Sequence, residues 1–368
     1  MLSQNKYILC DLDTTGWNSM GEYFNWQQID FDFLPEASSV PVVDVIYDRI
    51  KGKDKVFLMV DPETTLKALY TQKSKYNNFL ELAKKIKLIL YAEDDMMNKL
   101  DRTLKNNPNF ASWINDLSPI VFTEGMAGHF YKKNYPNCKF IDLWHPHFHH
   151  SMSFPHFSSL QSTKDHNPTK DFLCLMCKKD ERPHRELLHN KIKSEGLIEQ
   201  GIYHYKPKSE HTWDDLKENY STPSIKSPLR PFLPPIEHYR DTNIELVAET
   251  FTSNNHDDSF YVTEKTLKPI SMKHPFMVLS NFNFLKRLKD LGFKTFHAHL
   301  DESYDSKEDV NERIDIIVDN LKTLKNNSYK FYQDTLNIRE HNHRHLQDLN
   351  GRWKTTLWKS LEQFWRDQ

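Results

Sequence analysis

Short apolar runs alternate with polar stretches along the first part of the chain. The segments at 77–87 and 95–105 lie between such runs and are compatible with helices. Strands alternating with helices are typical of a mostly parallel, three-layer α/β domain. The strand candidates are KYILC, KVFLMV, IKLILYA, PIVFT and KFIDLW. We therefore predict a first α/β domain over residues 1–160.

The chain loses this periodicity between residues 145 and 170, where it is rich in His, Ser, Phe and Pro, as in a linker. Beyond it, FLCLMC predicts a strand, and a helix follows over 183–195, with proline in the first turn where proline is tolerated. IYHY predicts a further strand, and an irregular stretch over 206–242 separates it from a strand-helix-strand core. This pattern predicts a second α/β domain over 161–335.

The end of the chain is polar and helical in pattern. We expect one helix over 307–325 and a long one from 328 onward, which carries Trp353, Trp358 and Trp365. The final part, over 336–368, is expected to pack back on the first domain. The predicted fold class is thus α/β, with two domains and a C-terminal helix.

The most informative segment lies between residues 244 and 296. It predicts a strand that ends at Glu249, a polar loop, and a helix whose first turn carries Thr263, Glu264 and Lys265. In open α/β sheets, nucleotides and phosphates bind where a strand's carboxyl end leads into a helix amino terminus, because free N–H groups and the helix dipole attract anions. Threonine is a good cap, and lysine supplies a point charge. An ordinary capped helix with solvated Glu and Lys side chains also fits this pattern.

A second strand-to-helix turn opens the same predicted domain. It carries Arg182, His184 and Arg185 directly after the strand FLCLMC. Two helix starts suited to anions are therefore expected to converge on one site. A nucleoside diphosphate has the charge and the ribose hydroxyls that such a set of side chains would bind.

The composition and charge of the chain disfavour some classes of protein and some kinds of site. Hydrophobic residues make up 38% of the 368 residues, the formal net charge is −2, and no run of 18 apolar residues occurs. We expect neither a membrane span nor a signal peptide, and a cytoplasmic location. The four cysteines include the pair Cys174 and Cys177, whose apolar surroundings favour a core strand over a metal or redox site. The histidines between 145 and 156 favour a polar loop, so no metal site is predicted.

The motif Glu249, polar loop, Tyr-Val-Thr-Glu-Lys resembles the donor-binding signature of α1,3-fucosyltransferases. That family has Asn-Ser after the glutamate, whereas this chain has Thr250 and Phe251, and its loop is longer. The upstream segment FLCLMCKKDERPHRELLHNKI is similar to the family's strand, turn and Arg-led helix. The resemblance covers about a third of the chain and implies a GT-B glycosyltransferase, in which two Rossmann-like domains, here 1–160 and 161–335, face a cleft. It does not fix fucose as the sugar.

The resemblance also implies roles for individual residues. Arg185 and Lys265 would bind the diphosphate, Glu264 the ribose, and Glu249 or Asn254 would lie near the sugar. The donor would be a GDP- or UDP-linked sugar, with no further cofactor required. The complete set of expected donor-binding residues is Arg182, Arg185, Glu249, Asn254, Tyr261, Thr263, Glu264, Lys265 and Lys268.

A transferase of this kind also needs a base for the acceptor hydroxyl. IKLILYAEDD is similar to the family's strand-to-Glu element, which makes Glu93 the leading candidate, with Asp94, Asp95 and Asp13 as substitutes. The acceptor would be a glycan or a hydroxymethylated base in DNA. For DNA, Lys286, Arg287 and Lys289 are candidate phosphate contacts, although a solvated helix face explains them as well.

Two alternatives remain open from the sequence. YILCDLDTT resembles the first motif of haloacid-dehalogenase phosphatases, in which Asp11 would attack phosphate and Asp13 would lie beside Mg²⁺. The glycine usual after the second Asp is Thr14 here. The other alternative is a protein that binds a nucleotide sugar without turning it over.

Overall fold

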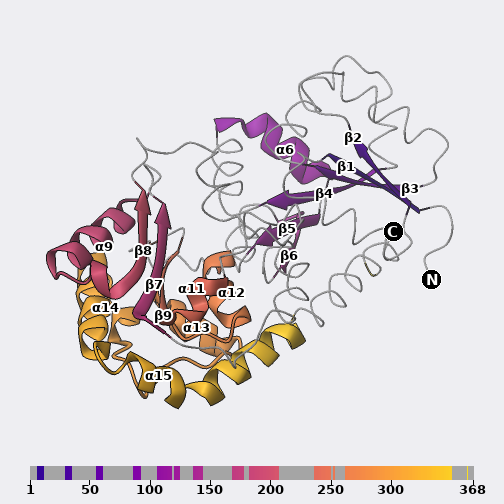
Figure 1. Cartoon of the computed structure of the whole chain (residues 1–368). Helices are drawn as coiled ribbons and strands as arrows, with labels where there is room; N and C mark the ends of the chain where they lie inside the picture. The colour runs from indigo at the N-terminus through magenta and orange to yellow at the C-terminus, as the bar shows by residue number, and fades with distance from the viewer. Residues whose placement is uncertain are drawn as a thin grey trace. The chain divides into compact units, whose positions relative to one another are not determined.

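The computed structural model describes the regular elements of the chain and most of its carboxy-terminal part. The described residues are 6–11, 30–34, 55–60, 86–92, 106–117, 120–124, 136–143, 168–177, 182–206, 236–249, 252, 262–349 and 363. The chain divides into two compact units, one comprising 1–148 with 355–368 and the other 149–354. Each unit contains a parallel β-sheet (Figure 1).

The sheet of the first unit has six parallel strands in the order β2-β1-β3-β4-β5-β6. Sequence patterns predict five of these strands. They do not predict β2, which has the sequence DFDFL, because its two aspartates interrupt the apolar run. A helix, α6 (Pro108–Leu117), buries Ile114. The strands are β1 (Lys6–Asp11), β2 (Asp30–Leu34), β3 (Lys55–Val60), β4 (Ile86–Ala92), β5 (Ile120–Glu124) and β6 (Lys139–Leu143).

The sheet of the second unit has four parallel strands in the order β10-β9-β7-β8. Every residue of the central strand β9 is buried, as expected where a parallel sheet is covered on both faces. The strands are β7 (Lys170–Cys177), β8 (Gly201–Lys206), β9 (Thr242–Ala248) and β10 (Phe276–Leu279). The protein therefore has an α/β fold.

Helices connect and cover these strands. α11 lies inside the stretch over 206–242 that the sequence predicts to be irregular. The prediction of irregular structure is therefore wrong for residues 236–240. Beyond α15, residues 336–349 are helical as well. The helices are α9 (Pro183–Ser194), η3 (Ile198–Gln200), α11 (Ile236–Arg240), α12 (Glu264–Ser271), α13 (Phe284–Asp290), η6 (Ser303–Ser306), α14 (Val310–Leu324) and α15 (Ser328–Asp334).

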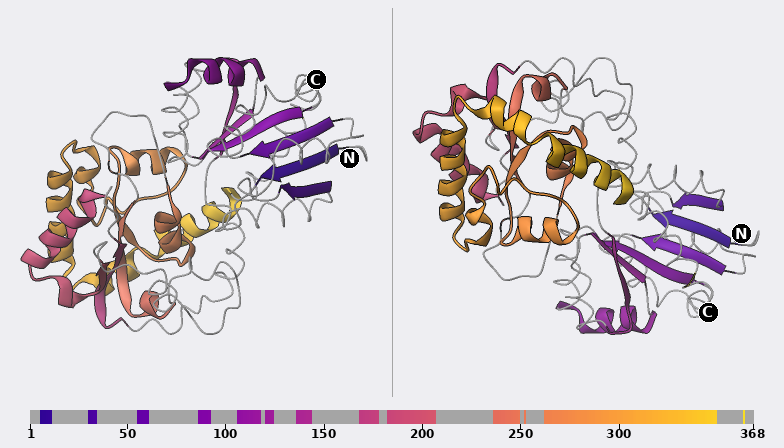
Figure 2. Two further views of the ribbon diagram at one scale, coloured as in Figure 1. Left: turned by 90° about the horizontal axis from the view of Figure 1, so that it is seen from above. Right: turned by 90° about the horizontal axis from the view of Figure 1, so that it is seen from below.

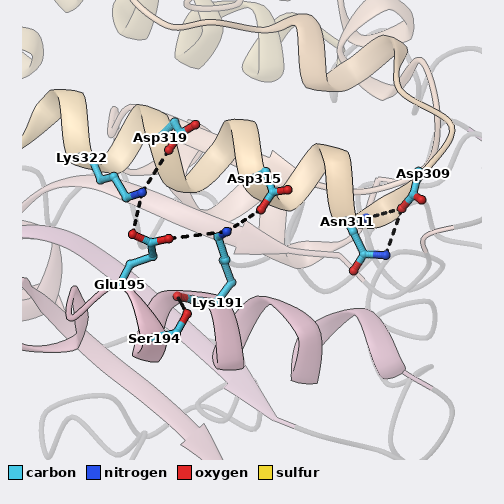
Figure 3. A network of polar contacts seen from close by, with 8 residues as sticks. All are labelled: Lys191, Ser194, Glu195, Asp309, Asn311, Asp315, Asp319 and Lys322. Atoms are coloured by element: carbon cyan, nitrogen blue, oxygen red, sulfur yellow. Dashed lines mark hydrogen bonds and ion pairs between the residues drawn. The ribbon is translucent and has the colours of Figure 1, made fainter.

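Two helices of the second unit, α9 and α14, lie side by side in each view of Figure 2. A chain of ion pairs joins them on the surface (Figure 3): Lys191 contacts Asp315 at 2.7 Å, and Lys322 contacts Glu195 at 2.6 Å. Glu195 also accepts from Lys191 at 3.5 Å, which links the two pairs. Exposed ion pairs each contribute at most about 1 kcal/mol, so the buried apolar side chains supply most of the stability.

No helix among the described residues is long and apolar enough to cross a membrane.

Candidate functional site

The strand order of the second sheet reverses between β7 and β9. From β7 the chain passes through α9 to β8 on one side, whereas from β9 it passes through α12 to β10 on the other. Ligands of open α/β sheets bind at the carboxyl ends of the strands beside such a reversal. At this point the end of β9 meets the amino termini of both α9 and α12 through hydrogen bonds.

Glu249, the residue directly after β9, holds the amino terminus of α12. Its side chain is 1% exposed. One carboxylate oxygen, Oε1, accepts from the Thr263 backbone N–H at 3.1 Å and from the Thr266 hydroxyl at 2.6 Å. The other, Oε2, accepts from the Thr263 hydroxyl at 2.5 Å. A carboxylate at a helix amino terminus is stabilised by the helix dipole, so Glu249 fixes the first turn of α12.

The main chain at the end of β9 is bonded to α9. Arg185 Nη2 donates to the carbonyl oxygens of Ala248 at 3.1 Å and Glu249 at 3.2 Å. His184 Nε2 lies 3.0 Å from the same Glu249 oxygen and donates to it in the matching tautomer. Both side chains are 3% exposed. Glu249 is therefore the point where the strand end and the two helix starts are joined.

His184 is neutral at pH 7. Its pKa is lowered to about 4, chiefly by burial and also by the charges of Arg185 and Arg182, while its bond to the Glu249 carbonyl acts in the opposite direction. The imidazole therefore adds no charge to the site under physiological conditions. The positive charges come from arginine and lysine.

Lys265 lies at the amino terminus of α12, as the sequence predicts. Thr263 caps the helix, and its hydroxyl oxygen accepts from the Lys265 backbone N–H at 3.2 Å. The Lys265 ammonium lies 3.3 Å from the same oxygen, beside the cap. The Lys265 residue is half-buried. Arg182 is the N-cap residue of α9 and makes no capping bond with its side chain. The charged residues of the two helix starts are Arg182, Arg185 and Glu186 at α9, and Lys265 with Glu249 and Glu264 at α12. Three positive and three negative formal charges balance at these sequence positions.

The observed contacts of Arg185 differ from those that the sequence predicts. Sequence reasoning assigns its guanidinium to a diphosphate, and in the structure that guanidinium is buried against main-chain carbonyl oxygens. A contact with phosphate stays a prediction for this residue. Its observed bonds give it a positioning role, because they fix the start of α9 relative to the end of β9.

Glu245 is a buried carboxylate that sequence reasoning missed. It is 6% exposed and accepts from the Tyr239 hydroxyl at 2.8 Å. Its pKa is raised to about 7, chiefly by burial and also by the charge of Glu249, while the bond from Tyr239 and the charge of Lys268 act in the opposite direction. Lys268, expected at the donor, thus lies where its charge acts on Glu245. The signal in the sequence is a single carboxylate inside the otherwise apolar run IELVA at 244–248.

Several expected site residues lie outside the described part of the chain. They are Asp13, Glu93, Asp94, Asp95, Asn254 and Tyr261, together with the side chain of Glu264. Their neighbours in sequence are placed: Ala92 is the last residue of β4, so Glu93 follows the carboxyl end of that strand, and Asp11 is the last residue of β1. Their roles stay predictions.

The Cys174 thiol is completely buried in β7, and burial raises its pKa far above the ordinary value. A thiol of this kind packs as a small apolar group and is a poor nucleophile. Within the described residues, no three His, Cys, Asp or Glu side chains are grouped as metal ligands.

Comparison with known proteins gives no family for the chain. No protein-family model matches it, and no curated protein is significantly similar to it in sequence.

Proposed function

We propose that this protein is a nucleotide-sugar-dependent glycosyltransferase of GT-B architecture. In this proposal, residues 161–335 bind a GDP- or UDP-linked donor, and the first Rossmann-like domain, over 1–160, supplies the acceptor side. The acceptor is a glycan or a hydroxymethylated base in DNA. No metal is required, because lysine, arginine and helix N–H groups would neutralise the departing diphosphate.

One observation carries the proposal: Glu249 joins the starts of α9 and α12 at the reversal of the strand order. Its carboxylate holds Thr263, and its carbonyl oxygen accepts from Arg185. Lys265 lies beside the cap that this bond fixes. Two helix starts joined at such a point, with a lysine ammonium beside the cap of one of them, favour a ligand with two neighbouring phosphates.

The proposed reaction is a displacement at the anomeric carbon of the donor sugar. The acceptor oxygen forms a bond to that carbon while the bond from the carbon to the diphosphate oxygen breaks. The electron pair of the broken bond leaves with the diphosphate, where the Lys265 ammonium would offset its charge. The proton of the acceptor hydroxyl passes to a carboxylate of the first domain, for which Glu93 is the leading candidate and Asp94 and Asp95 are substitutes.

A hydrolysis assay tests this function without knowledge of the acceptor. The protein is incubated with GDP-, UDP-, CMP- and ADP-linked sugars, and release of the free nucleotide is followed. The proposal expects release from one GDP- or UDP-linked sugar and strong loss of release in Glu93→Gln. Nucleotide binding with no release and no transfer to any acceptor would instead favour a non-catalytic nucleotide-sugar-binding protein.

DNA as acceptor has a separate test. Lys289 pairs with Glu302 at 3.2 Å, which reduces the charge that α13 offers to a phosphate backbone. Binding to a DNA duplex that contains hydroxymethylated bases should fall steeply with salt if DNA is the acceptor. Affinity that does not change with salt would leave a glycan as the acceptor.

A phosphatase is the second candidate, because of where Asp11 lies. It is the last residue of β1, and the strand order of the six-stranded sheet reverses at β1, with β2 on one side and β3 on the other. This is the usual place for a reactive group in an open α/β sheet. Mg²⁺-dependent hydrolysis of p-nitrophenyl phosphate that is lost in Asp11→Asn would favour this function over the transferase.

A further inference from the structure

A polar pocket lies at the opposite end of the second sheet from the candidate donor site. Its volume is about 430 Å³, within the range of small-molecule sites. It is bounded by the amino-terminal ends of β7 and β9, by η3, and by the start of α15. Because β9 runs through seven residues, about 20 Å separates its two ends, so the pocket is distinct from the Glu249 region.

Buried polar side chains form one wall of this pocket. Asn243 and Ser328 are 4% and 3% exposed. The Asn243 amide donates to the Ser328 hydroxyl at 3.0 Å, and that hydroxyl donates to a carboxylate oxygen of Asp171 at 2.5 Å. A carboxylate has about four acceptor positions, of which Ser328 uses one. The wall is thus a connected, preorganised set of hydrogen-bonding groups.

The charges around the pocket are mixed. Lys170 contributes an ammonium group, which donates to the Glu199 carbonyl oxygen at 2.7 Å. Asp171 and Glu199 contribute carboxylates. Two carboxylates and one ammonium leave a formal net charge of −1, which disfavours a phosphate or another anion because like charges repel. A neutral ligand with many hydroxyl groups matches the mixture of donors and acceptors in the lining, since each hydroxyl both donates and accepts.

Tyr329 adds an aromatic surface at the pocket. It is 48% exposed, one of three large hydrophobic side chains among the described residues that are clearly exposed. A tyrosine ring offers an apolar face together with a polar hydroxyl. A sugar ring has the matching character, with C–H groups on its faces and hydroxyl groups around its edge.

We propose that this pocket binds a neutral saccharide, at a site separate from the donor site. Asp171, Gln200 and Asn243 supply hydrogen bonds to its hydroxyl groups, and Tyr329 packs on one face of the ring. The inference does not depend on the proposed transferase activity, because it uses none of the residues assigned to the donor. For a transferase, such a site holds a glycan by a unit that does not react.

Saturation-transfer NMR on the full-length protein tests this proposal. The probes are the methyl glycosides of glucose, galactose, fucose and N-acetylglucosamine at millimolar concentration, with inorganic phosphate and spermidine compared by calorimetry. Saturation should reach the protons of at least one glycoside. Tyr329→Ala and Gln200→Ala should each weaken its binding by about tenfold.

Two controls locate the effect. Leu336→Ala, which also truncates an exposed apolar side chain, should leave binding unchanged, as should Lys265→Met in the proposed donor site. Melting temperatures close to that of the wild type verify that Tyr329→Ala folds. The proposal is overturned if no glycoside receives saturation, if Tyr329→Ala and Gln200→Ala bind as the wild type does, or if only phosphate or spermidine binds.

Discussion

Glu249 and Thr263 are joined by two hydrogen bonds, from the backbone N–H and from the hydroxyl of Thr263 to the two oxygens of one buried carboxylate. The same threonine caps α12, and Lys265 lies beside its hydroxyl. The end of β9 therefore determines the position of the first turn of α12 and of the Lys265 backbone within it. Removal of this carboxylate should affect both the stability of the fold and the proposed anion site.

Glu249→Gln replaces one acceptor oxygen by an amide that donates. Three donors converge on the carboxylate, from Thr263 and Thr266, so the substitution leaves at least one of them facing another donor. We expect the free energy of unfolding to fall by about 2 kcal/mol, as for hydrogen bonds to a buried charge. Urea unfolding measures it. Glu237→Gln, at an exposed position of α11, is the matched control and should change stability by less than about 0.5 kcal/mol. Equal effects of the two substitutions would contradict the role given to Glu249.

Thr263→Val keeps the shape of the side chain and removes its hydroxyl. The α12 cap and one bond to Glu249 are then lost, at a cost of about 1 to 2 kcal/mol. Thr263→Ser keeps the hydroxyl and should lie within about 0.5 kcal/mol of the wild type. Thermal unfolding of the two variants side by side checks the difference. A serine variant as unstable as the valine variant would show that the methyl group matters more than the cap.

The pH dependence of stability contains two opposing contributions. Burial raises the pKa of Glu245 from 4.5 to about 7, so its contribution is fully present below pH 4.5 and is lost as the pH rises through 7. Burial lowers the pKa of His184 from 6.5 to about 4, so its contribution is present above pH 6.5 and is lost as the pH falls through 4. Each contribution corresponds to about 3 kcal/mol of the free energy of unfolding. Between pH 4.5 and 6.5 the two contributions change with pH in opposite directions and largely cancel.

Single substitutions should separate these contributions. In Glu245→Gln the His184 contribution remains, so stability should decrease as the pH falls from 6.5 to 4.5. In His184→Asn the Glu245 contribution remains, and stability should decrease as the pH rises over the same interval. Urea unfolding at a series of pH values checks the signs. Slopes equal to that of the wild type in both variants would show that neither buried group titrates as described.

Local patterns predict the second sheet well. FLCLMC, the helix that begins at Pro183, and IYHY correspond to β7, α9 and β8, because apolar runs and a proline in the first turn are local signals. The cap at Thr263 is local for the same reason. α11 was missed, since a single turn of helix after a proline-rich stretch has too little periodicity to detect.

The positions of the site residues at the two helix starts could be predicted from the sequence, whereas only some of their hydrogen-bond partners could. That Arg185 and Lys265 open two helices follows from the sequence, whereas the bonds of Arg185 to the β9 carbonyl oxygens depend on long-range packing. The pairing of Glu245 with Tyr239 joins residues six positions apart on a helix and a strand, and its burial depends on the sheet around it. Burial and hydrogen-bond partners are tertiary properties that no local pattern contains.

Isothermal titration of GDP and UDP into the wild type and Lys265→Met tests the central claim, that the start of α12 binds a diphosphate. At least one nucleotide should bind the wild type, and Lys265→Met should weaken it by at least about tenfold with the melting temperature unchanged, because Lys265 is half-buried at the helix start. Lys286→Met, at an exposed position of α13, should bind as the wild type does. Unchanged affinity in Lys265→Met, or the absence of binding by either nucleotide, would contradict the account.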